Sequence, residues 1–204
     1  MRKTIASWLF IRLLVKPAVI FDELSETRPS PYVVFFRFLL WMALAPPVFA
    51  FIGASQFGWR LGAAEPLYLS PGELIPISVA YFAVLIFGFV STALVSQWMA
   101  TTYGARSSLG IHLAMVTIVV APLVVGSAVH LFPHIFINVL VLIPALIWSM
   151  YLLYRGLPVV LQISPERGML MSSALIGWLL VAAVSFLGLM VALWGRGIGP
   201  SIGV

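Results

Sequence analysis

The sequence has very few charged residues and no cysteine. Charged side chains make up 8% of its 204 residues, against about 25% in a typical soluble domain. Hydrophobic residues make up 62%, and the mean hydropathy is +1.12. A soluble fold cannot hide this much apolar surface, so the composition predicts a membrane protein. The lack of cysteine excludes disulfides, thiol catalysis and cysteine-based metal sites.

The common sequence patterns of catalysis are also missing. The chain has no Ser-His-Asp set, no glycine-rich phosphate loop, no HExxH motif and no paired carboxylates. His112 and His130 share a helical face, but they would lie about 27 Å apart along the helix and cannot share a metal. We expect these histidines at the two membrane edges, bonded to water or headgroups. The sequence therefore predicts a protein that is not an enzyme and that holds no metal or cofactor.

Five continuous apolar runs are long enough to cross a bilayer, since about 20 helical residues span roughly 30 Å. We expect spans at about 31–55, 71–98, 109–131, 134–154 and 166–194. They form a transmembrane domain over residues 30–195, followed by a flexible tail over 196–204. Three spans begin with a Ser-Pro pair, which suits the N-cap and the first helical position. The predicted fold class is an all-α, polytopic membrane protein with five transmembrane helices.

Residues 1–29 form a separate N-terminal segment. Trp8, Arg12 and Lys16 fall on one stripe of a helix, as in an amphipathic helix that lies on a membrane surface. A cleaved signal peptide is the alternative interpretation, but Arg12 and Lys16 interrupt the apolar stretch and no A-x-A site follows. We therefore expect an interfacial helix over residues 1–21, followed by a short polar segment.

Basic side chains are distributed unevenly between the two sides of the predicted membrane domain. With the N-terminus inside, nine of the eleven Lys and Arg residues fall on the inner side: Arg2, Lys3, Arg12, Lys16, Arg28, Arg37, Arg106, Arg155 and Arg167. Only Arg60 and Arg196 fall outside. Cytoplasmic segments carry this excess, so we expect a cytoplasmic N-terminus and an external C-terminus. The net charge of +5 then indicates contact with anionic lipid and not with nucleic acid.

One candidate site lies on the predicted inner face. Two predicted loops, around 103–106 and over 155–168, bring arginines together with aromatic and glycine neighbours: Tyr103, Gly104, Arg106, Arg155, Gly156 and Arg167. Guanidinium groups there would bind a lipid phosphate or a partner carboxylate. The alternative interpretation is that these arginines only follow the positive-inside rule and bind nothing specific.

A second candidate is a pathway through kinked helices. Pro46, Pro47, Pro122, Asn138 and Pro144 all fall inside predicted spans, and broken helices near the bilayer midplane form substrate sites in some transporters. Prolines are also common in membrane helices, where they shape the packing of the bundle. The spans carry no internal carboxylate, which argues against proton-coupled transport.

Small residues form a stripe in the second predicted span. Gly88, Thr92 and Ser96 are spaced by four residues and share one helical face. Such stripes let membrane helices approach closely. We expect this stripe to mark a close contact with another helix, either in the same chain or in a second copy.

Several glycine, proline and aromatic motifs occur in a characteristic order. Tyr103-Gly104 precedes a span with a central Pro122 and a closing Phe132-Pro133. Tyr154-Arg155-Gly156-Leu157 follows the fourth span, and Ile163-Ser164 precedes the fifth. From about residue 16 to residue 194, this order resembles the Yip (Ypt-interacting protein) domain family in its bacterial branch.

The resemblance implies five transmembrane helices, a cytoplasmic N-terminus and a place in the bacterial inner membrane. Eukaryotic members of the family associate with Rab-type GTPases and carry an acidic-Leu-Tyr-Gly-Pro type motif. Here Phe21-Asp22-Glu23-Leu24 is followed by Ser25, so GTPase binding is not implied for this chain.

The expected function is membrane organisation or scaffolding, without catalytic activity. The expected partners are membrane lipids, including anionic headgroups on the cytoplasmic face, and a membrane-protein partner or a second copy of the chain. The alternative is a small-molecule transporter or channel subunit that uses the proline-kinked helices.

Overall fold

The structure, a computed structural model, describes residues 17–60, 65–105 and 108–196. In chain order, the elements are α2 (Pro17–Ser25), α3 (Pro31–Val34), the π-helix η1 (Phe35–Leu39), α4 (Leu40–Phe57), α5 (Pro71–Thr102), α6 (Leu109–Gly126), the 3₁₀-helix η2 (Ser127–Leu131), α7 (Ile135–Leu161) and α8 (Pro165–Trp194). Extended backbone in these ranges makes only two isolated bridges, Trp59 with Leu67 and Arg60 with His134. The all-α fold class is confirmed.

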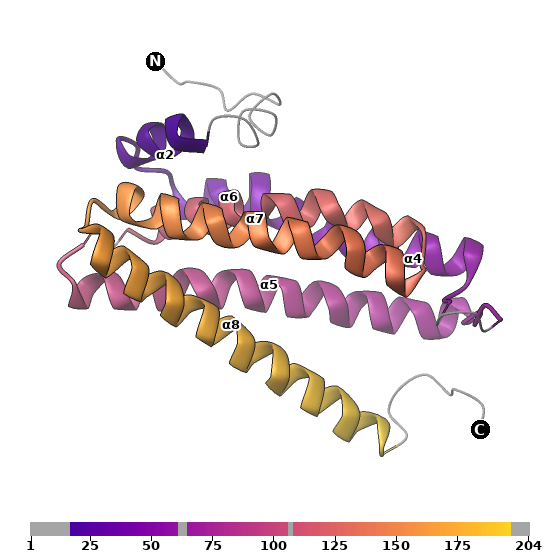
Figure 1. Ribbon diagram of the computed structural model, residues 1–204. Coiled ribbons are helices and arrows are strands. Elements are labelled where there is room, and N and C mark those ends of the chain that lie inside the picture. The colour runs from indigo at the N-terminus through magenta and orange to yellow at the C-terminus, as the bar shows by residue number, and fades with distance from the viewer. Residues whose placement is uncertain (1–16, 61–64, 106–107, 197–204) are drawn as a thin grey trace.

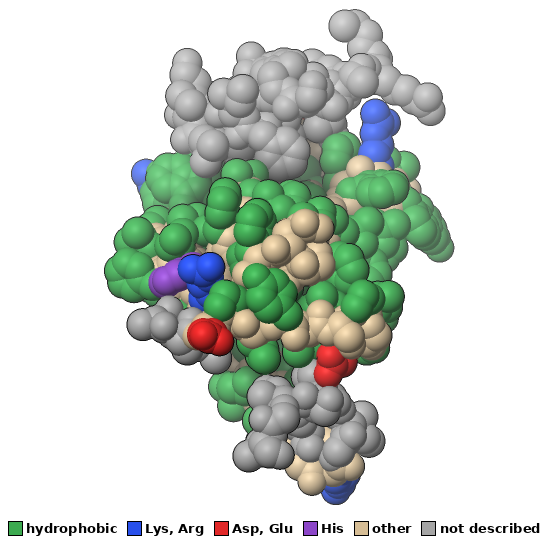
Figure 2. Space-filling view, turned by 90° about the vertical axis from the view of Figure 1, so that its right-hand side faces the viewer, with side chains coloured by type: hydrophobic (Ala, Val, Ile, Leu, Met, Phe, Trp, Pro, Cys, Tyr) green, Lys and Arg blue, Asp and Glu red, His purple; other side chains and the backbone are tan. Residues whose placement is uncertain are grey.

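Five of the helical segments in the described ranges are long and apolar enough to cross a membrane. They cover Pro31–Phe57, Pro71–Thr102, Leu109–Leu131, Ile135–Leu161 and Pro165–Leu193. The predicted five-helix architecture is confirmed, and three of the spans run further than the sequence predicts. Figure 2, which faces one end of the molecule, shows apolar side chains over most of the surface and only scattered charged ones.

The long helices form an elongated bundle (Figure 1). At its centre is α6: half of its most apolar window is buried, against 6% for α5 and for α8. Around it pack α4, α5 and α7. By contrast, α8 begins beside the end of α7, crosses α5 at an angle and points away from the bundle at its C-terminal end (Figure 1). Below, the end that carries α2 is called the α2 end, and the end where η2 turns into α7 is called the His130 end.

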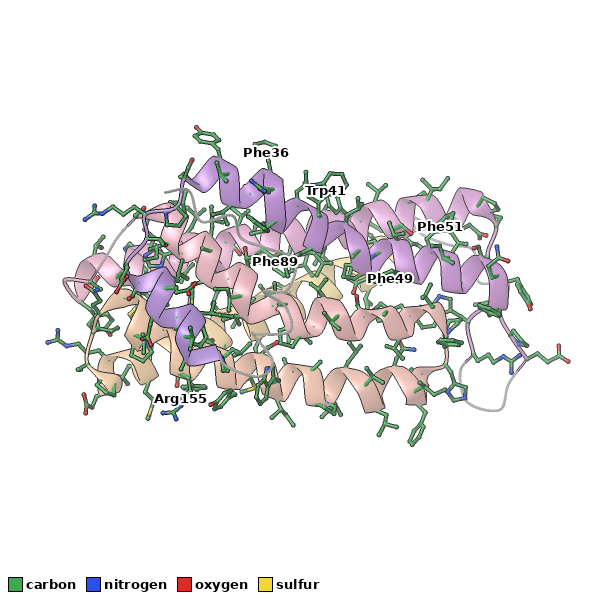
Figure 3. The ribbon with its side chains drawn as sticks, turned by 90° about the horizontal axis from the view of Figure 1, so that it is seen from above. Phe36, Trp41, Phe49, Phe51, Phe89 and Arg155 are labelled. Atoms are coloured by element: carbon green, nitrogen blue, oxygen red, sulfur yellow. The ribbon has the colours of Figure 1, made fainter. Side chains whose placement is uncertain are left out.

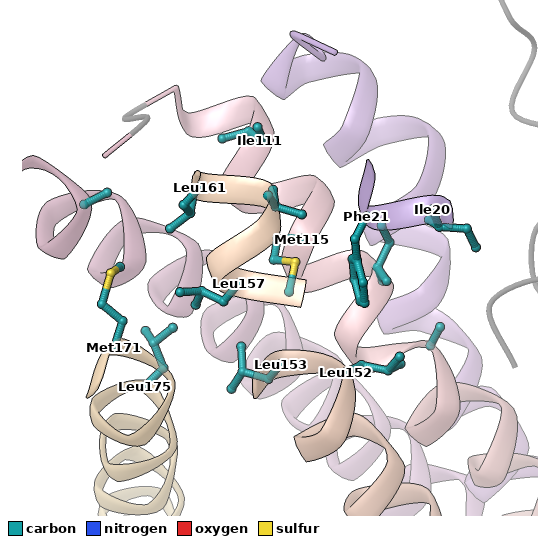
Figure 4. Packing of buried hydrophobic residues seen from close by; sticks show 14 of the residues in the cluster. Ile20, Phe21, Ile111, Met115, Leu152, Leu153, Leu157, Leu161, Met171 and Leu175 are labelled. Carbon is teal, nitrogen blue, oxygen red and sulfur yellow. The ribbon is translucent and has the colours of Figure 1, made fainter. Parts of the chain in front are cut away.

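The largest buried cluster in the described chain lies at the α2 end (Figure 4). Four helices supply its labelled members: Ile20 and Phe21 from α2, Ile111 and Met115 from α6, Leu152, Leu153, Leu157 and Leu161 from α7, and Met171 and Leu175 from α8. Lipid tails are as apolar as these side chains, so close packing and not removal from water holds such helices together. The cluster fixes α2 and the start of α8 to the bundle.

The fourth span continues well past its predicted end. The sequence predicts a loop over 155–168, but α7 runs to Leu161 and α8 begins at Pro165. Glycine and proline usually indicate a loop, but here both residue types pack between helices. The ring of Pro158 lies against Gly168: a Cβ added at Gly168 would be only 2.6 Å from Cβ of Pro158. The residue that follows Leu161 and caps the helix is Gln162, whose backbone is left-handed with a φ of 56°. Arg155 and Gly156 are therefore helical residues.

The first span has one irregular turn. Proline removes a backbone donor, so the sequence predicts a kink at Pro46-Pro47. In the structure both prolines are buried and α4 continues through them. The departure from α-geometry is the π-helix Phe35–Leu39, which the sequence does not predict. Phe36 and Trp41, on this part of the span, project outward (Figure 3) and are 60% and 62% exposed, as lipid-facing side chains are.

The N-terminal segment is only partly described. Trp8, Arg12 and Lys16, the predicted surface stripe, lie outside the described residues, and so does Arg106. The described part begins at Pro17, and α2 continues to Ser25 through the predicted polar segment. Instead of standing apart from the bundle, α2 packs against α7.

Candidate functional site

The predicted basic site lies at the α2 end, and the structure joins its two halves through one contact. The side chain of Arg167, in the first turn of α8, donates from Nη1 to the backbone oxygen of Tyr103, 3.4 Å away. Ser164 caps this turn by accepting from the backbone N–H of Arg167. Tyr103 ends α5, and Gly104 follows it with a φ of 65° that favours glycine. The connection after α5 and the start of α8 are therefore neighbours, as the sequence predicts.

Arg155 and Gly156 belong to the same end but have different surroundings. Arg155 is exposed and projects away from α7 (Figure 3). Gly156 is buried beneath the ring of Phe21, and an added Cβ would overlap the ring and lie 2.7 Å from Cε of Met115. Arg155 therefore contributes charge to this end, while Gly156 is a docking point for α2.

The five residues of the predicted pathway do not converge on one space. Pro46, Pro47 and Pro122 are buried inside their helices, whereas Pro144 is exposed on α7. Asn138 is 8% exposed and its amide is committed to hydrogen bonds. Pro46, Pro47 and Pro122 are therefore part of the helix packing, whereas Pro144 is not.

Asn138 is the centre of a polar cluster at the His130 end. Its Nδ2 donates to the backbone oxygens of Phe132 and His134, both at 3.0 Å. Its Oδ1 is hydrogen-bonded to Nδ1 of His130, and Nε2 of His130 lies 3.5 Å from the hydroxyl of Tyr81. The cluster ties the turn between η2 and α7 together. The expectation of a histidine bonded only to water or headgroups does not hold for His130, which has protein partners.

A second polar pair is buried inside the bundle. Nδ1 of His112 on α6 lies 2.9 Å from Oγ of Ser96 on α5. His112 lies in the first turn of α6, but it is 1% exposed and bonded to protein, so the expectation that it bonds water or headgroups does not hold. Buried polar groups are expensive in hydrocarbon unless they are bonded, and this pair bonds across two helices. The sequence shows both residues in apolar spans but gives no sign that they meet.

Next to this pair is a cavity of about 240 Å³ between α5, α6, α7 and α8. Its walls are lined by Val84, Leu85, Gly88, Phe89, Thr92, Ser96, His112, Met115, Val116, Val119, Val120, Leu123, Leu153, Leu157, Leu175, Leu179, Ala182, Ala183 and Phe186. None of these is charged, and the residues of the predicted proline pathway are not among them. The stripe of Gly88, Thr92 and Ser96 faces this cavity. The close helix contact that its spacing predicts is made at Ser96, which bonds His112 of α6, but not at Gly88, where an added Cβ would meet nothing within 4 Å.

The two places offer different groups to a ligand. Among the described residues no group of three His, Asp or Glu side chains is arranged to hold a metal ion. The α2 end offers arginines to an anion, and the cavity offers apolar walls.

The fold and these sites define a polytopic α-helical membrane protein. The chain belongs to the Yip1 domain family, which it matches over residues 11–194. It is 35% identical over 159 residues to the inner membrane protein YohC of Escherichia coli K12, and this alignment covers 78% of the chain and 82% of the relative. The inner membrane protein YohC of Escherichia coli O6:H1 matches over the same length with the same identity. No solved structure gives a significant match.

Proposed function

We propose that this chain is a non-catalytic protein of the bacterial inner membrane that organises its surroundings by binding anionic lipid at its cytoplasmic face. The observation that carries the proposal is the contact between Arg167 and the backbone of Tyr103. This contact places a guanidinium where two connections of the bundle meet, with the exposed Arg155 at the same end. Basic residues at a cytoplasmic surface attract anionic headgroups, each contributing about 1 kcal/mol.

The proposed orientation puts the α2 end in the cytoplasm. The excess of Lys and Arg in the segments predicted for that side supports this orientation. The name of the relatives, inner membrane protein YohC, supports a location in the inner membrane. The docking of α2 on α7 supports a role for the N-terminal segment at the same surface.

Lipid preference tests the proposal. The full chain is placed in nanodiscs with equal phosphatidylglycerol and phosphatidylcholine, and the lipids retained after release are counted by native mass spectrometry. Arg155→Gln and Arg167→Gln should each reduce the preference for phosphatidylglycerol about fivefold. The matched control is Arg60→Gln, at the His130 end. A preference that is unchanged in the first two variants, or lost equally in the control, contradicts the proposal.

Transport along the prolines is not proposed. Pro144 points out of the bundle, and the amide of Asn138 is committed to the turn between η2 and α7. These positions support a packing role.

A further inference from the structure

The cavity between α5, α6, α7 and α8 is a second binding place, distinct from the arginines of the α2 end. We propose that it holds one acyl chain of a membrane phospholipid inside the bundle. This goes beyond the proposed function, because the site recognises hydrocarbon and needs no charged contact. Three observations carry it: the open face of α5, the fixed angle of α8 and the chemistry of the walls.

The open face of α5 is centred on Gly88. A Cβ built on this glycine would meet no atom within 4 Å outside its own helix. Thr92 and Ser96 continue the same face, and both line the cavity. Small side chains here leave a gap where leucines would otherwise fill the space between helices. The stripe therefore creates volume inside the bundle.

The angle of α8 keeps the gap open. The indole Nε1 of Trp178 donates to Oγ of Ser91 at 3.2 Å, and the rings of Phe186 and Phe87 meet edge to face at 5.2 Å. Both contacts join α8 to α5 at the side of the cavity. They brace α8 along α5 as far as Phe186, while the C-terminal end of α8 points away from the bundle (Figure 1). The far wall is then formed by small and apolar residues of α8, including Ala182 and Ala183.

The walls suit hydrocarbon and not water. Their polar groups are already bonded: Ser96 to His112, and Thr92 to the backbone oxygen of Gly88 at 2.6 Å. A buried water needs about two to four polar partners, and apolar cavities without them stay dry. The remaining lining is aliphatic and aromatic. A polar solute would lose its hydration without compensation, whereas an acyl chain from the surrounding bilayer would lose nothing.

The volume favours a single thin chain. Pockets for drug-sized ligands measure roughly 300–1,000 Å³, and this cavity measures about 240 Å³. A volume below that range admits a segment of one acyl chain and excludes two tails or a larger ligand. The occupant to which the structure points is thus one tail of a phospholipid, with its headgroup at the membrane surface.

A filling variant tests the site in the intact protein. Gly88→Leu places a side chain in the open space, and the matched control is Gly177→Leu, since Gly177 on α8 also has open space around it but does not line the cavity. The full chain is reconstituted with phosphatidylglycerol or with phosphatidylcholine that carries a photoactivatable diazirine on one acyl chain. After illumination, labelled segments are identified by mass spectrometry.

We expect the acyl label on residues 84–96 and 175–186 with either headgroup. Gly88→Leu should reduce this labelling several-fold relative to the exposed face of α7, because the added side chain occupies the space that the acyl chain would fill. Gly177→Leu should leave it unchanged. Arg167→Gln, which tests the anionic-lipid proposal, should also leave it unchanged, so failure of one proposal is distinguishable from failure of the other.

Three results would overturn the inference. One is labelling of the cavity segments that persists in Gly88→Leu. Another is labelling confined to the outer faces of the helices. The third is a cavity closed by a second copy, seen as a cross-link between two chains across α8. If Gly88→Leu does not fold, Ala183→Phe fills the cavity from the α8 side, and the same three outcomes apply to it.

Discussion

The ring of Phe21 lies against the backbone of Gly156, in space that any side chain at that position would occupy. Phe21 is 2% exposed, although it comes from a short helix at the start of the described chain. The contact joins α2 to α7 beside Met115 of α6 (Figure 4). It makes α2 part of the folded bundle.

Gly156→Ala should therefore loosen α2. The added methyl group would overlap the ring of Phe21, and overpacking of this kind costs about 1–3 kcal/mol. We expect a lower thermal midpoint in detergent and faster proteolysis between α2 and α3. The control is Gly177→Ala, where space is open. If the two variants behave alike, Phe21 does not depend on the glycine. In the combination with Phe21→Ala, the cost of Gly156→Ala should be largely lost.

Asn138→Leu should destabilise the His130 end. It removes the side-chain amide that bonds Nδ1 of His130 and the backbone oxygens of Phe132 and His134. The two oxygens keep backbone N–H donors, whereas Nδ1 of His130 loses this partner, and an unpaired buried polar group costs about 1–3 kcal/mol. Tyr81→Phe is the milder comparison, because its hydroxyl lies 3.5 Å from His130. Thermal unfolding measured in the same detergent should rank Asn138→Leu well below Tyr81→Phe. The reverse order would show that the amide does not hold the turn.

Ser96 and His112 should behave as a coupled pair. Ser96→Ala removes the hydroxyl that bonds Nδ1 of His112, and His112→Leu removes the ring that bonds the hydroxyl. Removing both partners is cheaper than leaving one unpaired, so the double variant should lose less stability than the sum of the single variants. We expect a coupling of about 1 kcal/mol from a double-mutant cycle. Strict additivity would mean that the pair contributes no coupling energy.

The orientation has a direct test because the chain has no cysteine. Glu26→Cys and Glu65→Cys place single thiols at exposed positions on opposite ends of the bundle. In intact spheroplasts, a membrane-impermeant maleimide should label the Glu65 variant and spare the Glu26 variant until the membrane is opened. The opposite pattern would invert the proposed topology and place the arginines of the α2 end outside the cell.

The sequence predicts the membrane class and the number of spans because these depend on composition and length. The ends of the helices are harder to predict, since glycine and proline occur both in loops and at close contacts between helices. In the region after Tyr154 they look like loop residues, but Gly156 and Gly168 are sites of close approach in or beside helices. A glycine at a helix contact is recognised only by the side chain that packs on it, which is Phe21 for Gly156 and Pro158 for Gly168. Because these partners are not adjacent in the sequence, the local pattern does not reveal the contact.

The candidate sites are likewise predicted only where they do not depend on contacts between residues that are distant in the sequence. Arg167 and Tyr103, which the sequence places on the same side of the membrane from the order of the spans, are in contact, but whether they form a binding site stays a prediction. The cavity is not predicted, because a stripe such as Gly88 and Ser96 is compatible both with a tight contact and with a gap. The tilt of α8, which decides between them, is set by its contacts with α5 through Trp178 and Phe186.

The π-helix Phe35–Leu39 has a consequence for the rotational phase of the first span. Five residues of α-helix turn a side chain by about 500°, so Val34 and Leu39 would stand roughly 140° apart around the axis. Both are nevertheless buried in one cluster with residues of α5 and α6. The π-helix has more residues per turn than an α-helix, so each residue turns the chain less, and the two side chains come toward a common face. Deleting one residue within it should restore α-geometry and leave the side chains of Val34 and Leu39 about 40° apart, so that α3 and α4 stay in phase.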